Sequence, residues 1–306
     1  MVNGSMVEQK SLTFRVAQEQ HGQRLDKALV SLTGFGRRHV RALFEARCVS
    51  VEGQHLSPSH RAQVGMQVAV LSLPPTADAL TPFELKVTHE IEHWVIVDKP
   101  AGQPSVPLPG RSGNSVAELL LQRYPEMQDV GYRTSEAGLL HRLDTHTSGL
   151  LLAARSREAF QVLHQALRRG DLEKRYYAVV KSDASFRDQS IELNLEPHPK
   201  NRRKVAVVRS GGKTARTRVA IVQRGLHWTL LDVSVEQAYR HQIRVHLSHL
   251  GFPLAGDVLY GGARVNELGH RHALHAHFIA VPGCEQWAAF EATCPLPSEL
   301  AQLVKP

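Results

Sequence analysis

Residues 139–152 read LLHRLDTHTSGLLL, so a polar cluster stands directly before an apolar run. The run that continues over residues 149–154 is short and apolar throughout, which predicts a buried strand. Asp144 is therefore expected at the mouth of a sheet, where a low dielectric makes its negative charge costly unless a cation is paired with it. Position alone leaves two interpretations open, a loop aspartate that caps a turn and a functional carboxylate.

Outward from this stretch, strand-like and helical segments follow one another without strict alternation. Strand-like runs occupy residues 94–97, 176–180 and 229–235. Helical patterns occupy residues 114–123, 156–169 and 241–250. Ser156 is the expected N-cap of the second helix and Gly170 its stop. This order predicts an α+β fold with a mixed sheet rather than a doubly wound one.

The first quarter of the chain reads as a separate small α/β unit. We expect helices from Arg24 to Leu29 and over residues 37–46, and strands over residues 48–51 and 66–71. The proline-rich stretch after them has the composition of a linker. The predicted division is 1–20 a flexible N-terminus or first strand, 21–72 the small unit, 73–84 the linker and 85–306 a second domain.

Composition bounds the possible partners and the compartment. The 306 residues carry 37 Lys and Arg against 29 Asp and Glu, a formal charge of +8 that fits a polyanion such as RNA or DNA. No apolar run approaches the roughly 18 residues that would span a bilayer, and the start lacks the apolar region of a secretory signal. Three cysteines without a CxxC pair are typical of free thiols, and we expect a cytoplasmic protein.

Six further runs, in the same order along the chain, join the Asp144 stretch in one set of motifs. They are DKPAG at 98–102, KRY at 174–176, GKTART at 212–217, HQIRVH at 241–246, GDVLYG at 256–261 and LHA at 274–276. The ordered set resembles the ribosomal-large-subunit type of pseudouridine synthase. The N-terminal unit is similar to the ribosomal S-four-type RNA-binding domain that often precedes that catalytic domain. The two resemblances cover residues 24–280 and imply a mainly antiparallel sheet in the catalytic domain.

The resemblance implies isomerisation of uridine to pseudouridine in RNA without a cofactor. Asp144 matches the catalytic aspartate, and a carboxylate can either attack the anomeric carbon or remove a ribose proton. Arg244 matches the arginine that pairs with this aspartate, and Tyr176 the tyrosine that stacks on the target base. The target nucleotide has to be flipped out of its helix. Arg142 is expected at the flipped nucleotide or on a phosphate.

Two groups of basic residues are candidate RNA contacts outside the site around Asp144. On the helix expected at 37–46, the side chains of Arg37, Arg38 and Arg41 lie off the apolar stripe. The second group is a loop after Pro199. The predicted RNA-binding residues are Arg24, Arg37, Arg38, Arg41, Lys200, Arg202 and Arg203, although solvated surface charge is an equally good interpretation of the loop.

One departure from the family pattern precedes the HQIRVH run. The family reads Gly-Arg-Thr there, whereas this chain has Ala238-Tyr239-Arg240. A glycine is thereby lost where a turn can require a positive φ, and the arginine moves by one place.

Other functions and sites are weaker alternatives. A catalytically inactive RNA-binding or chaperone protein on the same fold is the main one, and a glycoside hydrolase would need a second carboxylate. Histidines cluster between His270 and His277, but no carboxylate or cysteine is spaced to complete a metal site, so no metal is expected. The predicted partner is ribosomal RNA, or else transfer RNA, bound by a monomer.

Overall fold

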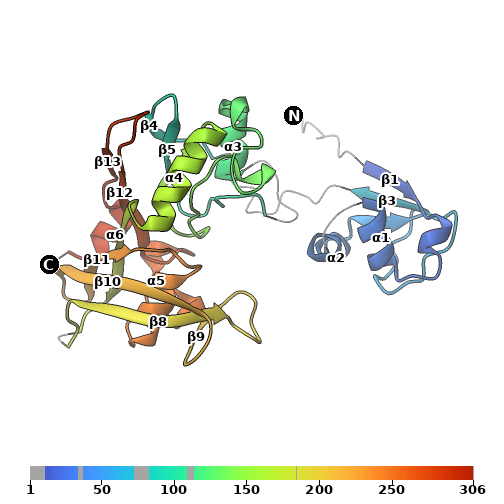
Figure 1. Cartoon of the computed structure of the whole chain (residues 1–306). Helices are drawn as coiled ribbons and strands as arrows, with labels where there is room; N and C mark the ends of the chain where they lie inside the picture. The colour runs from blue at the N-terminus through green and yellow to red at the C-terminus, as the bar shows by residue number, and fades with distance from the viewer. Residues whose placement is uncertain (1–10, 34–36, 72–82, 109–113, 184, 306) are drawn as a thin grey trace, which may run out of the picture. The chain divides into compact units, whose positions relative to one another are not determined.

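The computed structural model describes residues 11–33, 37–71, 83–108, 114–183 and 185–305. The chain divides into two compact units, residues 1–83 with 108–112 and residues 84–107 with 113–306 (Figure 1). Residues 73–82 of the predicted linker lie outside the described residues, and the predicted domain limits stay a prediction. Among the residues described, no helix has the length and apolar character needed to cross a membrane.

The N-terminal unit is a three-stranded antiparallel sheet with two helices. Its strands lie in the order β1-β3-β2. They are β1 (Ser11–Arg15), β2 (Val49–Val51) and β3 (Gln67–Leu71), and the helices are α1 (Leu25–Thr33) and α2 (Arg37–Glu45). Leu25 and Leu29 of α1 pack with Leu43 of α2 and with Val68 and Val70 of β3, which closes a small core of its own.

The second unit, residues 84–107 with 113–306, contains one ten-stranded sheet among its described residues. Its main path runs β4-β5-β6-β12-β7-β11-β10-β8-β9, and β13 pairs with β12. All pairings are antiparallel except that of β12 with β6, which joins His275 to Ser148 and Ala276 to Gly149. The predicted α+β class with a mixed, mainly antiparallel sheet is confirmed.

The strand bounds are β4 (Val87–Glu90), β5 (Trp94–Lys99), β6 (Ser148–Ala154), β7 (Glu173–Lys181), β8 (Gln189–Pro197), β9 (Val205–Val208), β10 (Lys213–Arg224), β11 (Trp228–Val235), β12 (Leu274–Val281) and β13 (Phe290–Thr293). The helices are α3 (Val116–Arg123), α4 (Arg157–Arg169), α5 (Gln242–His249) and α6 (Ser298–Leu303). Single 3-10 turns occupy Gln18–Gln20, Pro125–Met127, Thr134–Glu136, Val258–Tyr260 and Asn266–Leu268.

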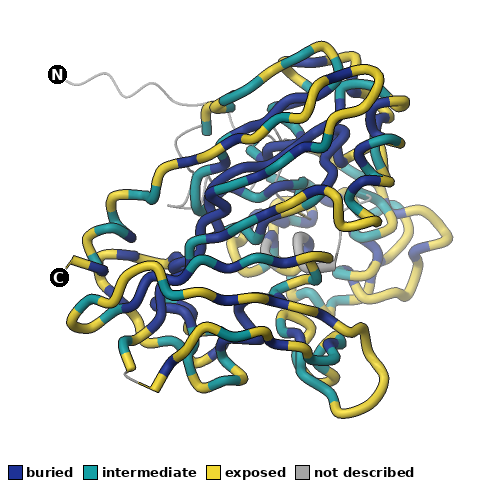
Figure 2. The backbone as a smooth tube through the Cα atoms, turned by 60° about the vertical axis from the view of Figure 1, so that its left-hand side comes forward, coloured by how far each residue is buried: buried dark blue, intermediate teal, exposed yellow. Residues whose placement is uncertain are grey.

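Helices cover both faces of this sheet, which explains why all seven residues of β6 are buried. Leu150 and Leu152 pack with Phe160 and Leu163 of α4 on one face. Leu151 and Ala153 belong to the core on the other face, together with residues of α3 and α5. In Figure 2 buried backbone runs along the central strands and exposed backbone marks the loops between them. The buried strand predicted at 149–154 is confirmed.

Candidate active site

Asp144 stands in a tight loop whose backbone is held on both sides. The loop leaves and re-enters the sheet where Leu140 N–H donates to the carbonyl of Leu152. Just before Asp144, the Ser105 hydroxyl donates to the Leu143 carbonyl (2.8 Å) and accepts from Leu143 N–H (3.0 Å). Just after it, Lys99 Nζ donates to the Thr145 carbonyl at 3.1 Å. The position of Asp144 is therefore fixed before any side chain touches its carboxylate.

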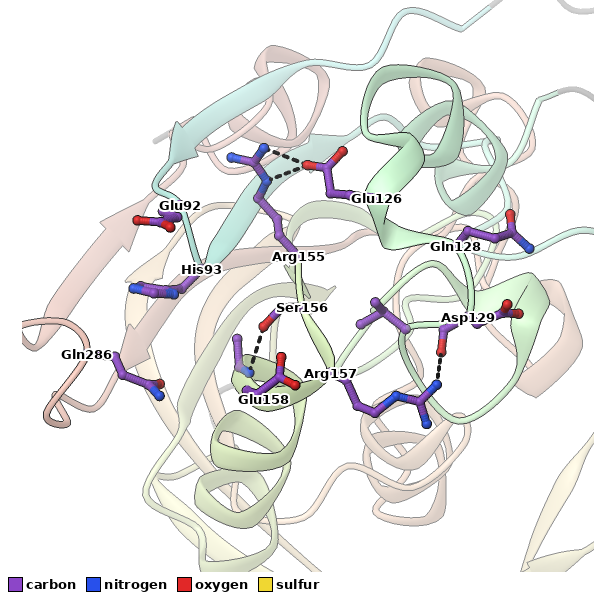
Figure 3. A pocket seen from close by; sticks show the side chains of 12 residues that line it. Glu92, His93, Glu126, Gln128, Asp129, Arg155, Ser156, Arg157, Glu158 and Gln286 are labelled. Carbon is purple, nitrogen blue, oxygen red and sulfur yellow. Dashed lines mark hydrogen bonds and ion pairs between the residues drawn. The ribbon is translucent and has the colours of Figure 1, made fainter.

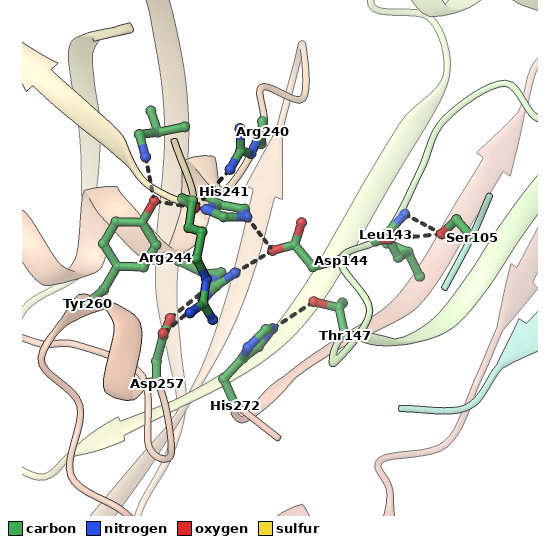
Figure 4. A network of polar contacts seen from close by, with 12 residues as sticks. Ser105, Leu143, Asp144, Thr147, Arg240, His241, Arg244, Asp257, Tyr260 and His272 are labelled. Atoms are coloured by element: carbon green, nitrogen blue, oxygen red, sulfur yellow. Dashed lines mark hydrogen bonds and ion pairs between the residues drawn. The ribbon is translucent and has the colours of Figure 1, made fainter. Parts of the chain in front are cut away.

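The end of the same loop is tied to β12 and its approach. Thr147 Oγ1 lies 2.8 Å from His272 Nε2, in a buried contact that Figure 4 shows beside Asp144. Ser148 Oγ lies 2.9 Å from His275 Nδ1, across the parallel pairing of β6 with β12. Two of the histidines that suggested a metal site are thus hydrogen-bonded to hydroxyl groups. Within the described part of the chain, no three His, Cys, Asp or Glu residues are grouped so that they could hold a metal ion.

Arg244 links Asp144 to a second, fully buried carboxylate. Its Nη1 donates to Asp144 Oδ2 at 2.7 Å, while Nε and Nη2 donate to Asp257 Oδ2 and Oδ1 at 2.7 and 2.8 Å (Figure 4). The bidentate contact fixes the plane of the guanidinium group. The Asp257 side chain is 1% exposed, Arg244 8% and Asp144 26%. Asp144 is the open end of a buried three-residue ion network.

The electrostatics of this network keep Arg244 charged. Burial opposes the charge, but the hydrogen bonds to Asp257 and the attraction of Asp144 and Asp257 outweigh it and raise the pKa of Arg244. The ring of Tyr260 adds to this, since the guanidinium carbon lies 5.0 Å from its centroid.

His241 approaches the same carboxylate oxygen from the N-terminus of α5. Its Nε2 lies 3.6 Å from Asp144 Oδ2, and its Nδ1 lies 2.8 Å from the Tyr260 hydroxyl. Burial lowers the pKa of His241 to about 4, although the charge of Asp144 acts in the opposite direction. The imidazole is therefore neutral at pH 7.

The charge of Asp144 affects two further titratable side chains. Lys99 Nζ donates to the carbonyls of Pro100, Gln103 and Thr145, and burial lowers its pKa to about 7 even though the charge of Asp144 opposes the change. Tyr176, on β7, is buried, and burial together with the charge of Asp144 raises the pKa of its phenol. The phenol therefore keeps its proton at neutral pH.

The structure brings together Asp144, Arg244 and Tyr176, three of the residues that the sequence assigns to the pocket. Arg142 is exposed instead, and its Nη1 lies 3.8 Å from Glu136 Oε1. The sequence alone assigns no role to Lys99, Asp257, His241 or Tyr260. Each stands in one of the quoted runs, which was the signal available for them, but the contacts that give them a role join residues far apart in the chain.

The candidate RNA contacts lie in two places. Arg24 is paired with Asp26 and Arg41 with Glu45, both at 2.8 Å, and the side chains of Arg37 and Arg38 lie outside the described part of the structure. Lys200, Arg202 and Arg203 are exposed on the loop between β8 and β9.

Arg240 connects that loop to the site. Its Nη2 donates to the carbonyls of Arg202 (2.9 Å) and Arg203 (2.8 Å). The positive φ considered for position 238 is absent there and falls at His241 instead, with φ 56°. The departure from the family pattern therefore gives Arg240 a defined contact with the basic loop.

A separate open pocket of about 710 Å³ lies at the N-terminus of α4 (Figure 3). Its walls carry charges of both signs, and both of its arginines are bonded within the protein. Arg155 donates to Glu126 Oε1 from Nε and Nη2 at 3.1 and 2.6 Å, and Arg157 donates to the carbonyl of Asp129. None of the residues around Asp144 lines it.

The chain is similar to known proteins over nearly its whole length. The family model for RNA pseudouridylate synthases matches residues 93–249. An uncharacterised RNA pseudouridine synthase of Bacillus subtilis, YlyB, is 31% identical over 299 residues, 96% of this chain and 97% of the relative. Ribosomal large subunit pseudouridine synthase D of Neisseria meningitidis serogroup B is 32% identical over 303 residues, 94% of this chain and 79% of the relative.

Solved structures support the same fold. Human RNA pseudouridylate synthase domain containing 1 superposes with a TM-score of 0.55 at 22% identity, over 71% of this chain and 86% of that one. The human protein named domain containing 4 gives the same TM-score at 20% identity, over 71% of this chain and 90% of that one.

Proposed function

The chain belongs to the family of RNA pseudouridylate synthases and isomerises uridine to pseudouridine in RNA, and from that premise we propose that Asp144 is the catalytic carboxylate and ribosomal RNA the substrate. In this reaction the bond from C1′ to N1 of uracil breaks, a bond from C1′ to C5 forms, C5 loses a proton and N1 gains one. No other reactant is consumed.

The observation that carries the assignment is the one-sided bonding of Asp144. Arg244 and His241 both face Oδ2, and no described residue is hydrogen-bonded to Oδ1. A carboxylate held through one oxygen presents the other to the substrate in a fixed direction, which lowers the entropic cost of reaction. Oδ1 is the oxygen that would attack C1′ or remove the ribose proton, and both routes stay open.

Tyr176 and Arg142 have supporting positions. The ring of Tyr176 lies in the apolar core beside Asp144, where it can stack on a flipped uracil and help to keep water away from the detached base. Arg142 is exposed two residues before Asp144. Once its side chain separates from Glu136, it can contact the RNA at the flipped nucleotide.

Ribosomal RNA is the proposed substrate because two relatives, which this chain matches over 79% and 89% of their length, are named ribosomal large subunit pseudouridine synthases. The basic loop, with Lys200, Arg202 and Arg203, would meet its phosphates. The S-four-like nature of the N-terminal unit, the monomeric state and the cytoplasmic location stay predictions.

The test is to incubate the full chain with unmodified transcripts of large-subunit ribosomal RNA that carry tritium at C5 of uridine. Tritium release with formation of pseudouridine is expected from the wild type. Asp144→Asn should reduce the rate at least ~10⁴-fold, since it removes the reacting group, with RNA affinity nearly unchanged. Asp171→Asn, at an exposed aspartate, is the matched control. An Asp144→Asn variant with normal turnover contradicts the assignment, and no product from any transcript, transfer RNA included, despite RNA binding favours the inactive alternative.

A further inference from the structure

We propose that His241 is a positioning residue for Asp144, held by the Tyr260 hydroxyl in the tautomer that turns an N–H toward Oδ2. The inference rests on the proposed catalytic role of Asp144. It concerns a residue that touches the reacting carboxylate, not the RNA.

The tautomer follows from the hydrogen bonds of the Tyr260 hydroxyl. This oxygen accepts a hydrogen bond from the backbone N–H of Val205 at 2.8 Å. Its own hydrogen needs an acceptor, and among the described residues His241 Nδ1, 2.8 Å away, is the one at hydrogen-bond distance. Nδ1 therefore accepts, so the proton of the neutral ring stands on Nε2. Nε2 is the atom that faces Asp144.

The backbone aims the ring in this direction. His241 precedes α5 in the left-handed conformation, with φ 56° and ψ 15°. This region is unfavourable for most residues, and histidine is among those enriched in it. The side chain of Gln242 then fixes the start of α5, because its amide donates to the Arg216 carbonyl and to Thr217 Oγ1. The contacts of the next residue thereby maintain the unfavourable conformation of His241.

A second donor on Oδ2 changes what Asp144 can do. Arg244 restrains the rotation of the carboxylate about its Cβ–Cγ bond through a single hydrogen bond. An N–H from His241, arriving from another direction, restricts that rotation and holds Oδ1 toward the substrate. At 3.6 Å the contact is slightly longer than a hydrogen bond, and such contacts commonly tighten when the substrate is bound.

Because of the charges around it, His241 acts as a neutral hydrogen-bond donor. Arg244 and Arg240 disfavour a positive charge on the ring, whereas Asp144 and Asp257 favour one. With Arg244 already bonded to both carboxylates, a second cation at this point would have no carboxylate of its own. His241 thus supplies an N–H to Asp144 without adding a charge to the network.

The decisive comparison is His241→Gln against His241→Met, two side chains of nearly equal size at the same strained backbone position. The Gln amide can place an N–H near the position of Nε2, and Met cannot. With tritiated ribosomal RNA transcripts, we expect His241→Met to lower kcat by up to ~100-fold with KM unchanged, and His241→Gln to recover most of the loss. A purely structural role would affect both variants equally.

Tyr260→Phe extends the test to the tautomer. In an otherwise wild-type chain, Tyr260→Phe should lower kcat, because the His241 ring can then also carry its proton on Nδ1 instead of Nε2. In the His241→Met background it should lower kcat no further. Any effect on KM through Val205 and its loop should be the same in both backgrounds.

The outcomes separate this inference from the proposed function. Equal kcat values for the Gln and Met variants, or an undiminished effect of Tyr260→Phe in the Met background, overturn the role of His241 while an inactive Asp144→Asn retains that of the aspartate. If His241→Met does not fold, His241→Asn replaces it, since Asn tolerates the left-handed conformation and is too short to reach Asp144.

Discussion

Lys99, near Asp144, shows that burying a single charged side chain has a large cost in free energy. Its side chain is buried, yet it orders the loop by donating to three carbonyl oxygens. Burial lowers its pKa from 10.5 to about 7, so the folded chain releases this proton more readily than the unfolded chain. Where the unfolded state binds more protons, stability rises with pH.

Lys99→Met should expose this linkage. The free energy of unfolding of the wild type, measured relative to the variant, should be flat below pH 7. It should rise between pH 7 and 10.5 by at most about 1.4 kcal/mol per pH unit. The measurement is urea unfolding followed by tryptophan fluorescence, which reports the catalytic unit because all three tryptophans, Trp94, Trp228 and Trp287, lie in it.

Lys86→Met provides the matched control for this titration. Lys86 is an exposed lysine whose hydrogen bond to Asp98 raises its pKa above 10.5. Its contribution is present below that value and is lost only above it, so the corresponding difference should stay flat from pH 7 to 9.5. A flat or falling difference for Lys99→Met would contradict its burial as an ammonium group.

At the scale of elements, Gly149 decides whether β6 and β12 can pair. It has φ +109°, and a Cβ built on it would lie 2.2 Å from the carbonyl oxygen of Ala276. Ala276 is the pairing partner of Gly149 in the parallel ladder. Glycine is therefore required for two reasons, its backbone conformation and the close approach of the neighbouring strand.

Gly149→Ala should destabilise the catalytic unit by about 2–6 kcal/mol, the sum of strain and overpacking. Gly170→Ala is the control, since Gly170 also has a positive φ, +84°, but nothing within 4 Å of a Cβ. It should cost only about 1 kcal/mol. Urea midpoints from tryptophan fluorescence compare the two variants. Equal losses of stability would show that β12 can move to accommodate the added Cβ.

Elements whose signals are local could be predicted from the sequence, and their pairing could not. The caps of α4 fixed its bounds to within one residue, because Ser156 and Gly170 act on adjacent backbone. The strand β8 was missed although Ile191, Leu193 and Leu195 alternate along it, and β12 was known only as a short motif. Which strands become neighbours depends on contacts across the whole chain.

The same limit applied to the site. Asp144 and Arg244 were identified through motifs, although 100 residues separate them. The buried partner Asp257 and the left-handed His241 were not, because neither a salt bridge nor a φ angle is written in residue type. Only the folded chain brings the GDVLYG turn against α5.

At the scale of the whole molecule, only some of the basic side chains are available to bind RNA phosphates. Arg24 and Arg41 are already paired with acidic neighbours. Arg202 and Arg203 project from a loop whose backbone is held by Arg240. Exposed cations on an anchored backbone can release phosphate counterions on binding without first breaking an internal ion pair.

The double change Arg202→Gln with Arg203→Gln should therefore weaken RNA binding and reduce its salt dependence. If each arginine meets one phosphate of single-stranded RNA, the slope of log K against log salt should fall by about 1.4. Filter binding at several salt concentrations measures it. Lys181→Gln, which removes an exposed cation at the end of β7, is the control and should leave the slope nearly unchanged. A slope unaffected by the double change would remove the loop from the RNA interface.

The short parallel pairing of β6 with β12 is a seam between two halves of the sheet. Asp144 precedes β6 on one side, whereas Arg244, Asp257 and Tyr176 come from segments on the other. The reaction centre is thus complete only when the two halves meet, which requires contacts between residues far apart in the sequence. A partly folded chain could present its basic loop to RNA, but it would lack the geometry that cuts a base from its ribose. Catalysis therefore requires the complete sheet.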